Sequence, residues 1–307
     1  MSDHRITRLR GIELGVTDLA RSVDFYTRVW GLASVGDVVE GECCLRASGS
    51  EHHVVSLRQS NVARMGGISF AVDNREAVDF FYRKAQVSGV SILKAPCELP
   101  ADKGGGYGVC LEGPEGLRLT ISADIALLEV LSGDSSKPIK LTHVVINAAD
   151  MPALSRFFRE FLGFQPSDTT HIMEFTRCPS GGQATDHHTV ALAHGDCLSL
   201  NHAAFEMSDI NGLMYGAGRL IENGYDIEWG LGRHGPGNNV FTYYIDPDGF
   251  VIEYTTEMEK INDTYEVHDA EYWASFPRRP CRWGVARKPS DRLMAAMAGK
   301  GLATTAS

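Results

Sequence analysis

One carboxylate stands in a stretch of apolar residues where a charge is costly. Residues 240–245 (V-F-T-Y-Y-I) and 250–255 (F-V-I-E-Y-T) are rich in β-branched and aromatic side chains, and the turn D-P-D-G separates them. This pattern predicts a β-hairpin with Glu253 inside its second strand. A buried carboxylate needs a cationic partner, and the nearest basic residues in the sequence do not obviously reach it. A metal ion would satisfy Glu253.

The sequence around this hairpin occurs twice in the chain. Each copy predicts a strand and a helix, then a second strand and helix, and finally a hairpin. The matching pairs, the first of them about 132 positions apart, are residues 9–32 with 141–164, 67–89 with 202–224, and 109–121 with 242–254. An internal repeat of this size predicts an α+β protein with two homologous domains, each made of two strand-helix-strand-strand-strand units.

The repeat also sets the expected domain boundaries. A chain of 307 residues is long enough for two domains. We expect an N-terminal domain without metal ligands at 7–122, a linker at 123–140, a catalytic C-terminal domain at 141–258 and a tail at 259–307. The linker contains S-G-D-S-S-K-P, a composition typical of loops. The tail is a candidate lid with a disordered end.

The two copies differ at three corresponding positions. If each residue served only local packing, nothing would make all three absent together from the other copy, so joint function explains the difference better. Two imidazoles and one carboxylate suit zinc with an open position, or the facial triad of a non-haem Fe(II) oxygenase, and the ligands alone do not separate these. The C-terminal copy has His143, His202 and Glu253 where the N-terminal copy has Gly11, Gly67 and Thr120.

Composition limits the partners and the compartment. The formal charge is −10 and no basic stripe offsets it, which argues against a nucleic-acid partner. No apolar run approaches the roughly 20 residues of a membrane span, and the first residues lack a secretory signal pattern. The seven cysteines form no C-x-x-C pairs and suit reduced thiols. We therefore expect a cytoplasmic protein without membrane contact.

The motifs of the C-terminal half resemble those of a known family. They are L-T-H at His143, D-H-H-T-V-A-L at His188, N-H-A-A-F-E at His202, G-R-H at His234, and Y-x-x-D-P-D-G-x-x-x-E-Y from Tyr243 to Tyr254. With the repeat, they resemble the type I extradiol ring-cleavage dioxygenases of the vicinal oxygen chelate superfamily, over residues 7–258. The resemblance implies four βαβββ modules that form curved, partly open mixed sheets.

The resemblance also implies a chemistry and a ligand set. Only the C-terminal domain would hold the metal, through His143, His202 and Glu253. The metal would be Fe(II), or alternatively Mn(II), and no organic cofactor is implied. The substrates would be a catechol-type aromatic diol and O2. Extradiol (meta) cleavage would give a 2-hydroxymuconic semialdehyde-type product in the degradation of aromatic compounds.

Three further residues match positions that the family uses for catalysis. His188 matches the acid–base histidine, while His234 and Tyr243 match groups that contact the substrate hydroxyls. An imidazole suits proton transfer near neutral pH, and a phenol can hydrogen-bond a catecholate oxygen. Tyr244 is a rival for Tyr243. His187 is expected to point away from the site, because neighbouring residues on a strand face opposite ways.

Some expectations concern the tail, the assembly and the alternative function. Arg278, Arg279 and Trp283 are candidates for substrate contacts, and the competing interpretation is a basic surface tail. Sheet edges and the resemblance predict a homo-oligomer, from a dimer to a tetramer or larger. The same fold also includes glyoxalase-like metal-dependent isomerases and lyases, thiol transferases and metal-free binding proteins, so a glyoxalase-like activity is the alternative.

Overall fold

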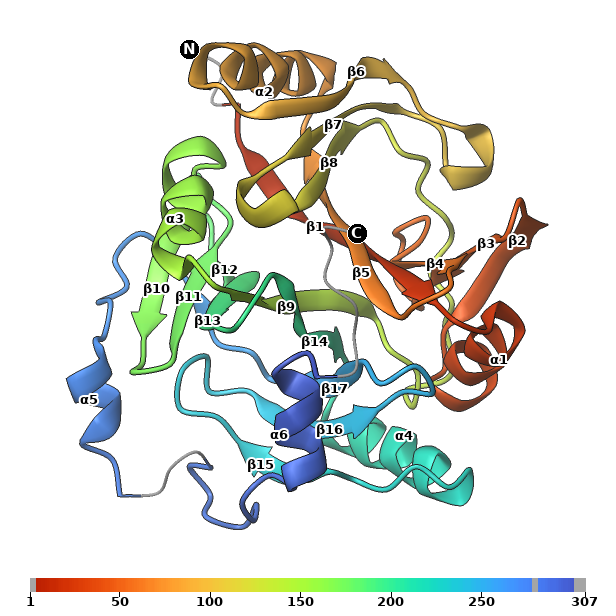
Figure 1. Ribbon diagram of the computed structural model, residues 1–307. Helices are drawn as coiled ribbons and strands as arrows, with labels where there is room; N and C mark the ends of the chain where they lie inside the picture. Colours follow the sequence, from red (N-terminus) through yellow and green to blue (C-terminus); the bar gives the residue numbers. More distant parts are fainter. Residues whose placement is uncertain (1–3, 278–280, 301–307) are drawn as a thin grey trace.

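The computed structural model describes residues 4–277 and 281–300, and it divides into two similar halves (Figure 1). The N-terminal half has two units in sequence, each a strand, a helical segment and three further strands. The elements of the first unit are β1 (Ile6–Val16), α1 (Leu19–Asp24), the π-helix η1 (Phe25–Val29), β2 (Ala33–Val39), β3 (Glu42–Arg46) and β4 (Val55–Gln59). Those of the second are β5 (Arg64–Val72), α2 (Arg75–Ser88), β6 (Ser91–Glu98), the short 3-10 turn η2 (Ala101–Lys103), β7 (Tyr107–Glu112), a second such turn η3 (Pro114–Gly116) and β8 (Arg118–Ala123).

The C-terminal half repeats this order and then continues into a tail. Its third unit contains β9 (Lys140–Ala148), α3 (Met151–Arg156), the π-helix η4 (Phe157–Phe161), β10 (Gln165–Thr169), β11 (Met173–Arg177), β12 (Thr185–Asp186) and β13 (Val190–His194). Its fourth contains β14 (Ser199–Glu206), α4 (Ile210–Glu222), β15 (Trp229–Arg233), β16 (Val240–Ile245) and β17 (Val251–Thr256). The tail carries β18 (Lys260–Ile261), α5 (Ala270–Ala274) and α6 (Asp291–Met297).

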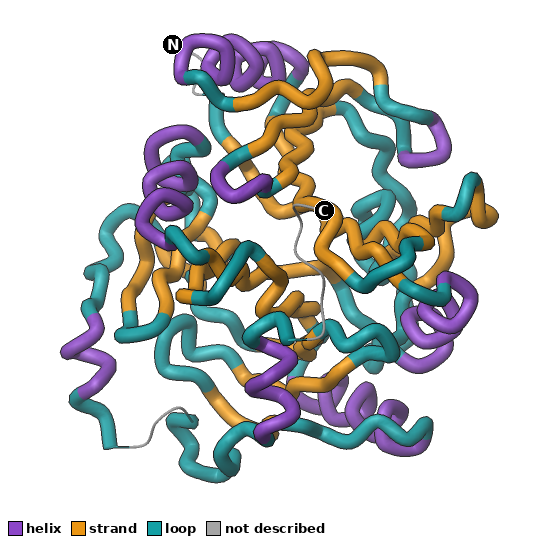
Figure 2. The backbone as a smooth tube through the Cα atoms, in the orientation of Figure 1, coloured by secondary structure: helices purple, strands orange, loops and turns teal. Residues whose placement is uncertain are grey.

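The two large sheets have the same topology. Their strand orders are β2-β3-β4-β1-β5-β8-β7-β6 and β10-β11-β13-β9-β14-β17-β16-β15, which match strand for strand. Helices α1, α2, α3 and α4 lie on the outside of the strands (Figure 2). The predicted α+β fold with two repeated, open mixed sheets is therefore confirmed. A small third sheet joins β12 to β18 and ties the tail to the C-terminal half.

The first helix of each half differs from its prediction. Within residues 9–32 the sequence pattern predicts a strand followed by one helix, but α1 ends at Asp24 and the chain continues as a π-helix in which the Trp30 N–H donates to the Phe25 carbonyl. The matching segment, η4, repeats this. The wider turn leaves carbonyl groups at its end without helical partners. In each half these carbonyls accept from a cation on the other half: Arg219 donates to the carbonyls of Val29 and Trp30, and Lys84 to those of Glu160 and Phe161.

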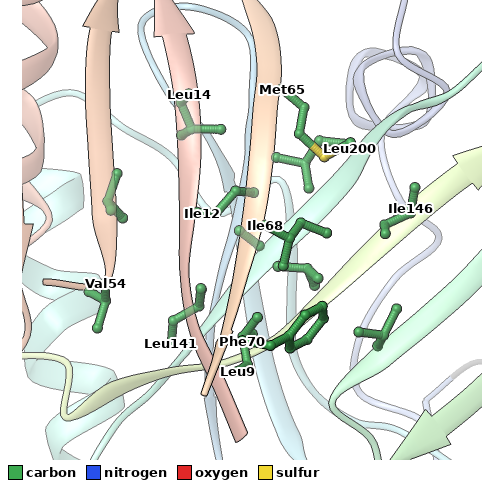
Figure 3. Packing of buried hydrophobic residues seen from close by; sticks show 14 of the residues in the cluster. Leu9, Ile12, Leu14, Val54, Met65, Ile68, Phe70, Leu141, Ile146 and Leu200 are labelled. Atoms are coloured by element: carbon green, nitrogen blue, oxygen red, sulfur yellow. The ribbon is translucent and has the colours of Figure 1, made fainter. Parts of the chain in front are cut away.

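The two halves share one hydrophobic core. Side chains from β1 and β5 pack against side chains from β9 and β14, as Figure 3 shows for Ile12, Ile68, Leu141 and Leu200. The hairpin turns reinforce this contact reciprocally. Asp248, in the last turn of the C-terminal half, accepts from the backbone N–H of Thr17 just before α1. Glu115, in the corresponding turn of the N-terminal half, accepts from the backbone N–H groups of residues 149 and 150 just before α3. Each half thus holds the start of the other's first helix.

Candidate metal centre

The strands of the C-terminal sheet present two different faces. Alternate residues of β9 and β17 join the shared core. The residues between them, which include His143 and Glu253, point to the opposite face of the sheet. The core-facing residues are Val144, Ile146, Ile252 and Tyr254. Strand alternation therefore places two of the predicted ligands on one side, as the sequence pattern indicates.

Strand pairing brings the third ligand to the same place and locates the equivalent residues of the N-terminal half. A bulge in the pairing of β14 with β9 sets His202 opposite Val145. In the C-terminal sheet His143 pairs with Ala204, and Ala204 with Glu253; in the N-terminal sheet Gly11 pairs with Ser69, and Ser69 with Thr120. The positions compared in the sequence are thus equivalent in space for the first and last strands.

The three residues converge closely enough to bind one ion. The Nε2 atoms of His143 and His202 each lie 3.3 Å from Glu253 Oε2, and one ligand atom from each residue falls within 4.8 Å of the others. Ligands about 2.1 Å from a common ion are separated by about 3 Å when they bind at right angles. The three residues form a non-haem metal site of the His-His-Glu type.

The electrostatics of Glu253 favour a cation. The residue is fully buried and its Oε2 atom has no hydrogen-bond donor, while Oε1 accepts from Asn239 Nδ2 at 3.3 Å. Burial alone raises the pKa of Glu253, but the two neighbouring imidazoles outweigh it and hold that pKa well below its usual range. A buried, ionised carboxylate with an unsatisfied oxygen is costly unless a positive charge compensates it. A divalent ion at this point fits.

Side chains behind His202 fix its orientation. Its Nδ1 atom lies 2.8 Å from Asn201 Oδ1, and Asn201 Nδ2 donates to Asn147 Oδ1 at 3.0 Å. Asn147 in turn donates to Ser199 and to the backbone carbonyl of Met297 in the tail. Because an amide oxygen only accepts, Nδ1 of His202 carries the proton and Nε2 keeps its lone pair for a metal. Asn147 lies on the face of β9 that alternation assigns to His143, whereas the sequence gives no sign of the bulge that places Asn201.

His234 and Tyr243 form a second pair at the edge of the site. Tyr243 lies opposite Glu253 in the hairpin, and its hydroxyl is 3.0 Å from His234 Nε2. Burial lowers the pKa of His234 to about 4, while burial and the nearby Glu253 raise the pKa of Tyr243 well above its usual value. Both groups are neutral at pH 7. Tyr244, the alternative to Tyr243, is fully buried in the shared core, where its ring packs against Trp30.

His188 reaches the site from the other side. Its ring centroid lies 4.4 Å from that of His143, and burial is the largest of the effects that lower its pKa well below the usual value. Gly237 packs closely against this ring, because a Cβ at position 237 would lie 3.0 Å from His188 Cε1. The ring of His187, expected to point away from the site, is fully buried, with Nδ1 3.0 Å from His188 Nδ1. Residues 187 and 188 lie between β12 and β13, where strand alternation does not apply.

The six predicted site residues in the C-terminal half therefore lie in one contiguous cluster with apolar walls. One wall joins β9, β11 and β13, and the other joins β15, β16, β17 and the tail. The first consists of Val145, Met173, Phe175, Ala191 and Ala193, and the second of Trp229, Phe241, Tyr243, Ile245, Val251, Cys281, Leu293 and Ala296. The strand order therefore places the metal ligands between two apolar clusters.

The tail contributes to the second wall. Helix α6 contacts β14, β16 and β17, and Leu293 is buried there. Trp283 is partly buried against the same wall and lies under the Arg233 guanidinium, whose carbon is 4.8 Å from the ring centroid. Arg278 and Arg279 lie outside the described residues. Within the described part of the chain, no helix is long and apolar enough to cross a membrane.

Comparison with known proteins places the chain in a family. The model of the glyoxalase/bleomycin resistance protein/dioxygenase superfamily matches residues 8–121 and 140–254. The chain belongs to this superfamily. Each half matches the model once, in agreement with the duplicated sheets.

Two similar proteins have known names. Metapyrocatechase 2 from Cupriavidus necator is 34% identical over 125 residues, which are 40% of this chain and 38% of that protein. A manganese-dependent 2,3-dihydroxybiphenyl 1,2-dioxygenase from Geobacillus genomosp. 3 is 26% identical over 270 residues, 79% of this chain and 82% of that protein.

Similar solved structures include a glyoxalase and a dioxygenase. The Mn(II)-bound glyoxalase from Novosphingobium aromaticivorans is 36% identical with a TM-score of 0.85, over 94% of each chain. Homoprotocatechuate 2,3-dioxygenase from Brevibacterium fuscum is 25% identical with a TM-score of 0.79, over 91% of this chain and 79% of that one.

Proposed function

We propose that the protein is an extradiol dioxygenase that cleaves a catechol-type aromatic diol with O2. The metal would be Fe(II), with Mn(II) as the alternative, and the product a 2-hydroxymuconic semialdehyde-type compound formed in the degradation of aromatic compounds. One observation carries the proposal: the metal ligands lie between two apolar walls, beside three side chains that are neutral at pH 7 and can transfer protons. The named dioxygenase relatives support it.

The metal ligands, together with the pair formed by His234 and Tyr243, would bind and deprotonate the diol. A bound Fe(II) or Mn(II) ion would supply electron transfer between diol and O2 and lower the pKa of the diol hydroxyls. His143, His202 and Glu253 would hold this ion and leave the side towards the walls open. In the tautomer of His234 with an unprotonated Nε2, the Tyr243 hydroxyl donates a hydrogen bond to it, so the phenol oxygen could accept a proton from a diol hydroxyl as it passes its own proton to His234. Because both groups are buried, the transfer avoids bulk water.

His188 would manage protons on the opposite side. A neutral imidazole beside His143 adds no charge to the site before the reaction. During the reaction it can accept a proton and return that proton to a leaving oxygen. The proposed groups on the two sides of the site therefore have different roles. Tyr243 and His234 would take protons from the diol, and His188 would exchange protons with the oxygen atoms that come from O2.

The proposal includes the setting of the enzyme. The seven free cysteines suit a reducing, cytoplasmic compartment. The outer strands of the sheets leave edges where copies of the chain can associate, which supports a homo-oligomer. We assign catalysis to a domain at 141–258, with 7–122 as its metal-free counterpart and 123–140 as the linker. The tail would act as a cover, since α6 already closes one wall.

A glyoxalase-like isomerase is the second candidate, because the similar structure from Novosphingobium aromaticivorans carries that name. It is favoured less by the site. The described ligand cluster supplies one carboxylate, Glu253, and lies within one half of the chain. An isomerase of this kind moves a proton between adjacent carbons, and a carboxylate base can do this alone. The phenol–imidazole pair of Tyr243 and His234 would have no role in that step.

One experiment separates the two activities. The protein is loaded anaerobically with Fe(II), or in a second sample with Mn(II), and then mixed with O2 and catechol, homoprotocatechuate or 2,3-dihydroxybiphenyl. We expect O2 uptake together with a yellow ring-fission product. The methylglyoxal–glutathione hemithioacetal tests the alternative: isomerisation of it without O2 uptake, combined with no ring fission in the catechol panel, would overturn the proposal.

A further inference from the structure

Behind His188 lies a chain of buried polar groups that the proposed reaction does not yet use. His187 Nδ1 is 3.0 Å from His188 Nδ1, and His187 Nε2 is 2.9 Å from Asp168 Oδ2 on β10. His187 and Asp168 are both fully buried. A buried carboxylate and imidazole in line with a catalytic imidazole resemble the support that other enzymes give to an acid–base histidine.

Residues of the tail hold Asp168, the carboxylate at the end of this series of hydrogen-bonded groups. Asp168 Oδ1 accepts from the backbone N–H of His268 at 2.8 Å, and Oδ2 accepts from the Tyr265 hydroxyl at 3.1 Å. With His187, three donors surround the carboxylate, so both oxygens of this buried polar group are hydrogen-bonded. The backbone N–H of His187 donates to the carbonyl of Glu259 at 2.8 Å, so the tail also holds the main chain of His187.

Proton positions along the chain follow from the acceptor at its end. A carboxylate oxygen accepts, so Nε2 of His187 carries the proton that faces Asp168 Oδ2, and Nδ1 of His187 has a lone pair. That lone pair accepts a hydrogen bond from the Nδ1–H of His188. Neutral His188 is therefore left with a lone pair on Nε2, the nitrogen turned away from His187, and it is ready to accept a proton.

The N-terminal half provides an internal comparison. His52 and His53 match His187 and His188 closely: the Nδ1–Nδ1 distance is 3.0 Å in both pairs, the ring centroids are 5.3 Å apart in both, and the rings cross at 86° and 89°. The difference is a buried carboxylate hydrogen-bonded to the first histidine of the pair, because Asp102, the carboxylate near His52, is exposed. When strand partners are followed outward from β1 and β9, Val35 occupies the position of Asp168.

We propose that Asp168 and His187 are positioning residues that hold His188 in the tautomer with an unprotonated Nε2. The histidine pair is common to both halves, but the carboxylate and its tail donors accompany only the half with the metal ligands. The proposal rests on the proposed function, since it assigns support to the catalytic role of His188. It also gives the tail a role in catalysis distinct from covering the site.

The first test reads the tautomer directly and needs no turnover. Protein labelled with 15N-histidine and loaded with diamagnetic Zn(II) is studied by NMR, and signals are assigned from His187→Leu and His188→Phe variants. We expect His188 to show a protonated Nδ1 and an unprotonated Nε2, and to lose this preference in His187→Leu. A protonated Nε2 on His188 in the wild-type protein would overturn the proposal.

The second test uses kinetics with a matched control. With the panel catechol that is turned over fastest, His187→Leu should lower kcat by about 10- to 100-fold, as the loss of an outer-shell partner does, with KM and metal content near wild type. Asp168→Asn, which keeps the shape of the side chain, should lower kcat less. His52→Leu, the same change in the N-terminal half, should leave kcat unchanged.

A double variant distinguishes positioning from general structural damage. If His187 acts through His188, adding His187→Leu to His188→Phe should lower kcat no further. A full additional loss in the double variant, or a kcat within twofold of wild type in His187→Leu, would overturn the proposal. If the wild-type protein turns over no catechol, the proposed function fails instead, and the NMR result still decides the tautomer.

Discussion

The hydrogen bond between Asn201 and His202 offers a sharp test of the metal site, because Asn201 contacts a metal ligand but would not itself bind the ion. Asn201 Oδ1 accepts from His202 Nδ1 at 2.8 Å. Replacing Asn201 with leucine keeps a similar volume and removes the acceptor. His202 can then exchange tautomers or rotate, and each alternative turns a protonated nitrogen or a misdirected ring towards the metal.

The expected magnitude follows from this arrangement. Loss of a partner behind a ligating histidine weakens metal binding by about 10- to 100-fold, which corresponds to about 1.4–2.7 kcal/mol. Asn201→Asp is the matched control, since a carboxylate still accepts from Nδ1. It loses the donation to Asn147 but should bind metal with near wild-type affinity.

The assay is a competition titration of Mn(II) against a fluorescent chelator for the wild-type protein and both variants, with circular dichroism to compare folding. We expect Asn201→Leu to show the weaker binding and Asn201→Asp to resemble wild type. Equal affinities in all three folded proteins would refute the reasoning that Asn201 orients His202.

Three further predictions concern the reaction and the contact between the halves. Tyr243→Phe should lower kcat on the order of 100-fold with unchanged metal content, because proton transfer to His234 is lost; unchanged kcat in stopped-flow assays would count against that role. Asp248→Ala should lower the free energy of unfolding by about 2–3 kcal/mol in urea titrations, because the fully buried carboxylate accepts from Thr17 at 2.8 and 2.6 Å, and a loss below about 0.5 kcal/mol would contradict this contact. Burial raises the pKa of Asp246 to about 7, so the folded state holds its proton more tightly than the unfolded chain, and stability present below about pH 4 is lost as the pH rises through 7. Compared with Asp246→Asn, the wild-type protein should therefore lose on the order of 2 kcal/mol more between pH 5 and pH 8, and parallel pH profiles of the two proteins would refute this.

Much of the fold can be predicted from the sequence, because the pattern of each element occurs in both copies of the repeat. Strand β16 falls at the predicted residues 240–245, and α2 ends at Ser88, just before the predicted Gly89. Gly89 adopts the left-handed conformation that closes the helix. The π-helices were not predicted, since apolar spacing does not distinguish a wide turn from an α-helical one. Only the packing of Arg219 and Lys84 from the opposite half reveals why these turns are tolerated.

The candidate site divides in a similar way. His143 and Glu253 follow from strand alternation and from comparison of the two halves. Tyr243 and Tyr244 are distinguished only once the hairpin register is known. Asp168 could not be linked to the site from the sequence, because its contacts with His187 and His268 depend on the tail crossing back over β10.

The most direct measurement of the central claim is metal content per chain, by elemental analysis of protein loaded with Mn(II) and freed of excess ion. The account predicts one ion per chain in the wild-type protein, its loss in Glu253→Ala, and full retention in Thr120→Ala, the equivalent change in the N-terminal half. Undiminished metal in Glu253→Ala, or loss of metal in Thr120→Ala, would contradict a single centre built from His143, His202 and Glu253.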